Sequence, residues 1–268
     1  MPFPEAKRVI YKKNPLIEVV CQLRFPRILS INEKEPVDFQ EKIRREYPLL
    51  NVQTEQEQQF TFDAVAKDSM PMPRMLQGES NKNYQFSSDD GIWRVNLTSR
   101  FLAVSTSKYT TWEAFKSRME NPLSALVSIY NPAFYERVGL RYIDAFNREE
   151  LGLEGNPWHE LIQPFALGLL SNPDVCEEIK GYSSIAEMPI EGGASARINT
   201  ALGYVNGVND NYTNKLSFIV DSDLYFGKIQ IDDLREALET LHGTSTKLIR
   251  ALITEKLHAA MEPDDYEH

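Results

Sequence analysis

Residues 194–205 and 215–226 read ASARINTALGYV and KLSFIVDSDLYF, and these two stretches set the architecture of the chain. Both are rich in β-branched and aromatic residues, and both alternate between apolar and polar side chains, which is typical of half-buried strands. A third strand is expected at residues 182–190, because the turn sequence Glu191-Gly192-Gly193 separates it from the next one. The pattern predicts three antiparallel strands in the C-terminal part of the chain.

A helix is expected to follow these strands, beginning near Gln230. Its apolar stripe has helical spacing and consists of Leu234, Leu238 and Leu241. Gly243 is expected to break or kink this helix, because glycine is a poor helix former. Residues 263–268, which follow the second half of the chain, form an acidic tail that we expect to be frayed.

The N-terminal part of the chain repeats this order of strands followed by a helix. Strands are expected at residues 16–25, 92–98, 100–107 and 135–146, and at the alternating stretch QQFTFDAVA within residues 51–68. Helices are expected near residues 36–47 and 111–130, and a short helix at 160–171. In the helix at 111–130, Trp112 and Phe115 belong to the stripe that faces the core.

The sequence therefore predicts an α+β fold of two tandem halves, each an antiparallel sheet with a helix on it. The two sheets could join edge to edge into one continuous curved sheet with the helices on one face. The boundaries that follow are residues 1–146 for the first half, 147–180 for a connecting segment, 181–262 for the second half and 263–268 for the tail.

Composition excludes several classes of protein. The hydrophobic fraction of 42% and charged fraction of 25% are those of a globular chain rather than a disordered one. The two cysteines, Cys21 and Cys176, lie far apart, so no disulfide framework or cysteine-rich zinc site is expected, and each is interpreted as a buried apolar side chain. No stretch reaches the length of a membrane span or of a secretory signal, so we expect a cytoplasmic protein without membrane contact.

The net charge of −10 disfavours sequence-independent nucleic-acid binding, although the charge is uneven along the chain. Residues 1–50 hold ten Lys and Arg against seven Asp and Glu. The basic residues that could face an acidic partner or a nucleic acid are Lys7, Arg8, Lys12, Lys13, Arg24, Arg27, Lys42, Arg44 and Arg45. The favoured interpretation is a solvated surface that offsets the acidic body.

The polar residues that attract most interest lie on two of the predicted strands. Asp221 and Asp223 share one face of their strand, and Arg137 and Arg141 share one face of theirs with Gly139 between them. Glycine within a strand can mark the close approach of a ligand or of another backbone. If the two strands are neighbours, two carboxylates meet two guanidinium groups across the sheet.

Three interpretations of these four residues remain open. The first is a structural network of salt bridges that joins the halves. The second is a site between sheet and helix, where Arg137 and Arg141 bind an anionic ligand through forked hydrogen bonds. The third is a metal-dependent hydrolase in which Asp221, Asp223 and Asp144 hold Mg²⁺, although Asp144 falls on the opposite face of its strand from the arginines.

No residue is assigned a catalytic role, and no metal site or cofactor is expected. The chain has no nucleophile elbow of the G-x-S-x-G kind and no glycine-rich phosphate loop. None of the four histidines has metal-ligand spacing with another, and His242 is interpreted as a capping or packing residue near the sheet.

Two segments, NPLIEVVCQLRF at 14–25 and RVGLRYID at 137–144, resemble an uncharacterised bacterial family of similar length. Asp221-Ser222-Asp223 and Leu241-His242 add to this resemblance, which spans most of the chain. The family is known mainly for its sporadic distribution and has no established activity. The resemblance implies an accessory gene in a mobile or defence-type locus, and a partner protein.

We therefore expect a non-catalytic binding or regulatory protein that acts through a protein partner or self-association. One alternative is a metal-dependent enzyme on nucleotides or nucleic acid that uses Asp221 and Asp223. The other alternative is a receptor for a small anionic ligand that uses Arg137 and Arg141.

Overall fold

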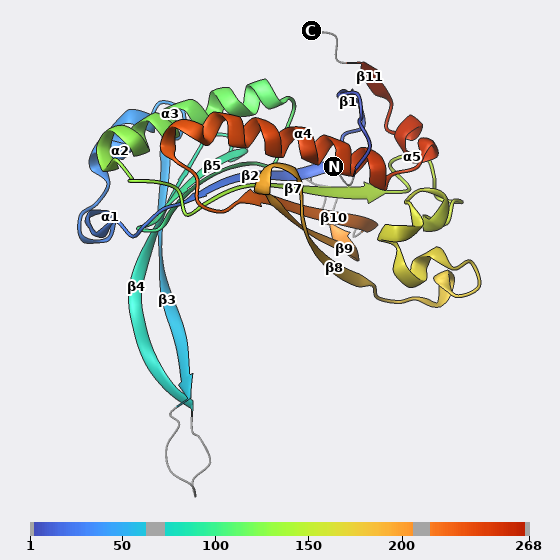
Figure 1. The fold of residues 1–268 in the computed structure, drawn as a ribbon, viewed down its shortest axis with the longest axis horizontal. Coiled ribbons are helices and arrows are strands. Elements are labelled where there is room, and N and C mark those ends of the chain that lie inside the picture. The colour runs from blue at the N-terminus through green and yellow to red at the C-terminus, as the bar shows by residue number, and fades with distance from the viewer. Residues whose placement is uncertain (1–2, 63–72, 206–214, 266–268) are drawn as a thin grey trace, which may run out of the picture.

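The computed structural model of the chain describes residues 3–62, 73–205 and 215–265. Its centre is one antiparallel sheet of nine strands in the order β3-β4-β5-β6-β2-β7-β10-β9-β8, and helices cover one face of that sheet (Figure 1). The predicted α+β class is confirmed. The predicted continuous sheet is also present, because β2 and β7 pair in the middle of it.

Each predicted strand has a counterpart in the large sheet, which also contains β4, a strand that the sequence pattern did not predict. The strands of this sheet are β2 (Leu16–Arg24), β3 (Leu49–Phe62), β4 (Pro73–Ser87), β5 (Trp93–Leu97), β6 (Phe101–Thr106), β7 (Arg137–Asn147), β8 (Ser183–Pro189), β9 (Ser195–Val205) and β10 (Lys215–Phe226). A second, two-stranded sheet pairs β1 (Val9–Tyr11) with β11 (Pro263–Asp265). The predicted strand residues 63–66 and the tail residues 266–268 lie outside the described ranges.

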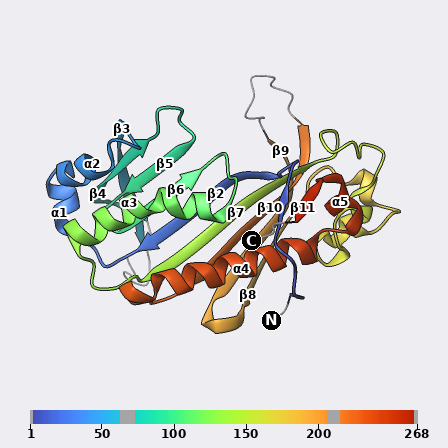
Figure 2. The same ribbon diagram turned by 90° about the horizontal axis from the view of Figure 1, so that it is seen from above.

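The helices form a layer over the sheet, as Figures 1 and 2 show. They are α1 (Leu29–Glu33), α2 (Val37–Ile43), α3 (Trp112–Tyr130), α4 (Leu234–Leu252) and α5 (Glu255–Ala260). Thr111 caps α3 by accepting a hydrogen bond from the Ala114 backbone N–H at 3.2 Å, and Asn131 ends it with a positive φ of 43°. The helix predicted at 111–130 is thereby confirmed.

Two buried clusters fill the space between the layers. The larger one includes Trp112 and Phe115, as their helical spacing predicted. The smaller one lies beneath the end of α4 and includes Phe146 and Phe218. Among the described residues, no helix has both the length and the apolar character that crossing a bilayer requires.

Three local expectations were wrong. The segment 160–171 forms separate 3₁₀ turns, at Trp158–Glu160, Pro164–Ala166 and Gly168–Ser171, rather than one helix. Helix α4 runs through Gly243 unbroken, because the leucines on both sides of it are buried in the same layer. Residues 263–265 are paired with β1 instead of being frayed.

The two cysteines differ in burial. Cys21 is buried in the core, as predicted, with 2% of its surface exposed. Cys176 was expected to be buried as well, but it is only half-buried. It belongs to the segment of 3₁₀ turns between β7 and β8.

Candidate functional site

The structure brings together the four charged residues that the sequence singled out. Strands β7 and β10 are neighbours, and Asp223 lies directly opposite Arg141. The ion pairs run diagonally, because Arg141 binds Asp221 at 2.6 and 2.7 Å while Arg137 binds both oxygens of Asp223 at 2.7 Å. We call these four residues the ion-pair ladder.

Gly139 has a local role in this ladder. A Cβ atom at this position would lie 2.2 Å from Nη1 of Arg137, so the guanidinium group lies across the glycine. The same guanidinium carbon is 4.4 Å from the centre of the Tyr225 ring. The close approach suggested by this glycine is therefore that of a neighbouring side chain on its own strand.

The ladder lies on the sheet face opposite to the helices. Tyr142 contacts α4, and strand alternation therefore places Arg137 and Arg141 on the other face. A ligand beside these arginines would not lie between sheet and helix, in contrast to the arrangement expected from sequence. Asp144 is on the helix-covered face, away from Asp221 and Asp223, so the three carboxylates of the magnesium interpretation do not converge.

Within the part of the chain that the structure describes, no three His, Cys, Asp or Glu side chains come together as a metal-ion site. Several of the basic N-terminal residues pair with acidic ones. Arg8 pairs with Glu113, and Lys12 and Lys13 pair with Asp264 and Glu262. These pairs support the interpretation of a surface that balances acidic charge.

A cavity of about 110 Å³ lies on the helix-covered face, between β7, α4 and the N-terminal segment. It is the strongest candidate for a functional site. Its lining includes Lys7, Arg8, Tyr11, Tyr109, Trp112, Tyr142, Asp144, His242, Ser245, Thr246, Ile249 and Arg250. We call it the strap cavity, and we call residues 3–15, which cross over it, the strap.

Local sequence periodicity places several of these side chains together. Tyr142 and Asp144 are two residues apart on β7 and therefore share a face. Five lining residues of α4 have the spacing i, i+3, i+4, i+7 and i+8, which is one helix face: His242, Ser245, Thr246, Ile249 and Arg250. The strand and the helix each contribute a stripe of mostly polar side chains to the same space.

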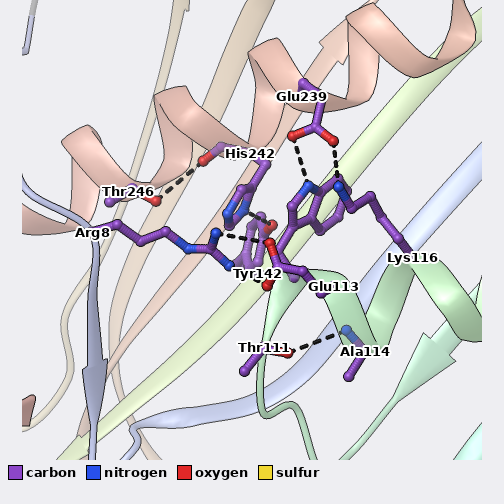
Figure 3. Close-up of polar contacts among 10 residues, drawn as sticks. Arg8, Thr111, Glu113, Ala114, Lys116, Tyr142, Glu239, His242 and Thr246 are labelled. Carbon is purple, nitrogen blue, oxygen red and sulfur yellow. Dashed lines mark hydrogen bonds and ion pairs between the residues drawn. The ribbon is translucent and has the colours of Figure 1, made fainter. Parts of the chain in front are cut away.

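The strap is held by contacts at its two ends. Arg8 donates to both carboxylate oxygens of Glu113 at 2.9 and 2.8 Å (Figure 3). Lys247 of α4 donates to Glu5 at 2.6 Å. Further along, β1 pairs with β11, and the Tyr11 hydroxyl is 2.8 Å from Nδ1 of His258. The contacts between charged side chains are exposed ones, which stabilise a segment only weakly.

His242 lies at the centre of the polar contacts in Figure 3. Its Nδ1 is 2.8 Å from the Tyr142 hydroxyl, and its ring stacks on Trp112 with 4.5 Å between centres. Burial lowers the pKa of His242 to about 4, and the positive charge of Arg8 acts in the same direction. The imidazole is therefore neutral at pH 7, and its buried Nε2 has no hydrogen-bond partner among the described residues. The predicted packing role of His242 near the sheet agrees with this stacked position.

Asp144 is the most unusual residue of the cavity. Only 2% of its surface is exposed, and its Oδ2 makes no hydrogen bond within the described ranges. Burial raises the pKa of Asp144 to about 7. A buried carboxyl group without a partner is costly to the fold, so its presence is a reason to look for a ligand.

Sequence reasoning did not identify the strap cavity. One signal was available, since Asp144 follows Val138, Leu140 and Tyr142 on the core-facing side of its strand. An acidic residue in that series indicates a buried carboxyl. The contributions of the strap and of Arg250 depend on contacts across the whole chain, so no local pattern indicates them.

A scan against protein-family models gives no match for this chain, and a search among curated proteins gives none either.

Proposed function

We propose that this protein is a non-catalytic, regulatory binding protein whose small polar ligand occupies the strap cavity. The observation that carries the proposal is the buried carboxyl of Asp144, whose Oδ2 has no hydrogen-bond partner among the described residues. The same cavity is lined by His242, whose Nε2 also lacks a partner among them. Apolar walls with a few convergent polar groups are typical of small-molecule sites. Ligand groups that pair with Asp144 would remove the cost of its burial.

A thermal-shift screen of amines, amino acids, carboxylates, alcohols and nucleotides tests this proposal on the full chain. A ligand present at one hundred times its dissociation constant stabilises the folded state by about 2.7 kcal/mol. For a chain of this size that corresponds to a rise of several degrees in melting temperature, about 2–4 °C per kcal/mol. At least one compound class is expected to give such a shift.

Two variants distinguish the cavity from the ladder. Ser245→Leu fills part of the cavity and is expected to abolish the shift. Arg141→Ala removes an ion pair on the opposite face and is expected to leave the shift intact. A flat screen contradicts the proposal, and a shift that Arg141→Ala abolishes instead supports the anion receptor built on Arg137 and Arg141.

A protein partner is the second candidate, favoured by a specific observation. In the described part of the chain, no helix covers the sheet face that carries the ion-pair ladder (Figure 1). The resemblance to a sporadically distributed family makes the product of a neighbouring gene the first partner to test. Its capture by the wild-type protein should be weakened by Arg141→Glu but not by Ser245→Leu. This candidate is contradicted if the protein purifies from its native host without any other protein.

We also infer that the fold consists of two tandem halves related about the β2–β7 pair. The first strand of each half, β2 or β7, lies in the middle of the nine-stranded sheet. The last strand of each half pairs with it, β6 with β2 and β10 with β7. Helices α3 and α4 follow those last strands. On this interpretation β7 begins the second half, whereas the boundaries expected from sequence placed residues 135–146 at the end of the first half. The cavity lies where α3, α4 and β7 meet.

A further inference from the structure

The strap cavity has an uneven balance of charge. Two of its lining cations are bound by acidic residues, Arg8 by Glu113 and Arg250 by Glu255. Lys7, the remaining cationic residue of the lining, is exposed. Asp144 is the acidic residue of the lining, and its Oδ2 has no partner among the described residues. The charged group of the lining that still needs a partner of opposite charge is therefore a carboxyl group.

Aromatic side chains surround the same space: Tyr11, Tyr109, Trp112 and Tyr142. The rings of Tyr109 and Tyr142 meet edge to face with 6.1 Å between centres. Aromatic rings attract cations through the negative potential of their faces, most strongly where water is excluded. They also provide apolar surface for the carbon atoms of an organic cation.

From this charge balance and these rings we infer that the strap cavity binds a small organic ammonium ion. Its N–H groups donate to the carboxylate of Asp144, and its carbon atoms contact the aromatic lining. This inference rests on the proposed function and narrows it to one class of ligand. A cavity of about 110 Å³ is large enough for a short aliphatic amine.

Binding of such an ion is coupled to proton release. The ligand pairs with the ionised form of Asp144, whereas the free protein keeps the proton on about half of its molecules near pH 7. The ionisable groups facing the cavity are Tyr11 from β1, Lys7 and Arg8 from the strap, Tyr109 from the loop before α3, Tyr142 from β7, and His242 and Arg250 from α4. Tyr11, Tyr142 and His242 stay neutral between pH 6 and 8, since burial raises the first two pKa values and lowers the third. The affinity is then expected to rise about tenfold from pH 6 to pH 8, in proportion to the ionised fraction of Asp144.

Calorimetric titration of the full chain with three probes of equal length tests the inference. The probes are butylammonium, butyrate and butanol. Butylammonium is expected to bind with a dissociation constant below 1 mM, a working threshold, and to release protons at pH 7. Butyrate and butanol are expected to bind at least tenfold more weakly. Asp144→Asn should weaken butylammonium binding at least tenfold at pH 8 and remove its pH dependence.

Ser245→Leu is the steric control and should remove butylammonium binding, while Arg141→Ala should leave it unchanged. The inference is overturned if butyrate binds better than butylammonium, if Asp144→Asn binds as well as the wild type, or if butylammonium fails to bind. Failure of the proposed function is a separate result. If another compound class raises the melting temperature of the wild type but not that of Ser245→Leu, the cavity is a ligand site for that other class. If no compound raises the melting temperature, both the inference and the proposed function are overturned.

Discussion

Asp144→Asn is expected to raise the free energy of unfolding at pH 8 by about 3 kcal/mol. The reason is that burial raises the pKa of Asp144 from its usual value near 4 to about 7. Between these two values the folded protein retains a proton that the unfolded chain has released. Stability of the wild type therefore falls as the pH rises through this window, and it is level above pH 7. The difference between these two pKa values corresponds to about 4 kcal/mol, part of which the buried amide of asparagine would offset.

Urea denaturation of both proteins at pH 4.5, 6 and 8 measures this effect. The difference between them should be small at pH 4.5 and largest at pH 8. His242, whose pKa is lowered to about 4, also makes the free energy of unfolding depend on pH. Both proteins contain this residue, so its effect largely cancels when their free energies of unfolding are subtracted. Asp221→Asn is the matched control, because this carboxylate is bound by Arg141 and its loss should destabilise the protein at pH 8. A destabilised Asp144→Asn protein at pH 8 would mean that Asp144 has a stabilising partner.

Trp112→Ala is expected to lower the free energy of unfolding by about 4 kcal/mol, the usual range for truncating a buried tryptophan. Only 1% of Trp112 is exposed, and its ring stacks on His242. Its Nε1 donates to Glu239 at 2.8 Å. Lys116 donates to the same carboxylate at 2.6 Å (Figure 3). The substitution removes contacts between α3, α4 and the sheet at once, and it enlarges the strap cavity.

The matched control for this prediction is Trp93→Ala. Trp93 is half-buried and packs on Phe115 with 5.7 Å between ring centres, so its truncation should cost about 2 kcal/mol. Urea denaturation at pH 7 compares the two variants. Equal decreases in the free energy of unfolding would show that the contacts of Trp112 with His242 and Glu239 add no stability beyond the packing of an indole ring.

Local periodicity was sufficient to predict most of the elements. Alternation along 135–146 and 194–205 gave strands because a sheet with one covered face buries every second residue. The stripe containing Trp112 and Phe115 gave helix α3 for the corresponding reason. The same periodicity failed at 160–171, where apolar residues pack beneath α4 and α5 in 3₁₀ turns instead of along one helix face.

The sequence alone placed Arg137 with Arg141, and Asp221 with Asp223, on single faces of their strands. That two-residue period is a property of any strand and needs no tertiary contact. Which strand each pair would meet, and that Arg137 would reach Asp223 across Gly139, depended on the register between β7 and β10. Register is decided by packing over the whole sheet, which local patterns do not specify.

The strap cavity depends on tertiary contacts even more than the ion-pair ladder does. The chain determined by itself that Asp144 would face the core, since it shares a face with Leu140 and Tyr142. Only the folded protein decided that no donor from the described residues would reach its Oδ2. It also decided that the strap would return over Asp144, with β1 paired to residues 263–265. The physical reason is sequence distance: strand and helix periods are set by neighbours a few residues away, whereas this cavity is closed by contacts between the two ends of the chain.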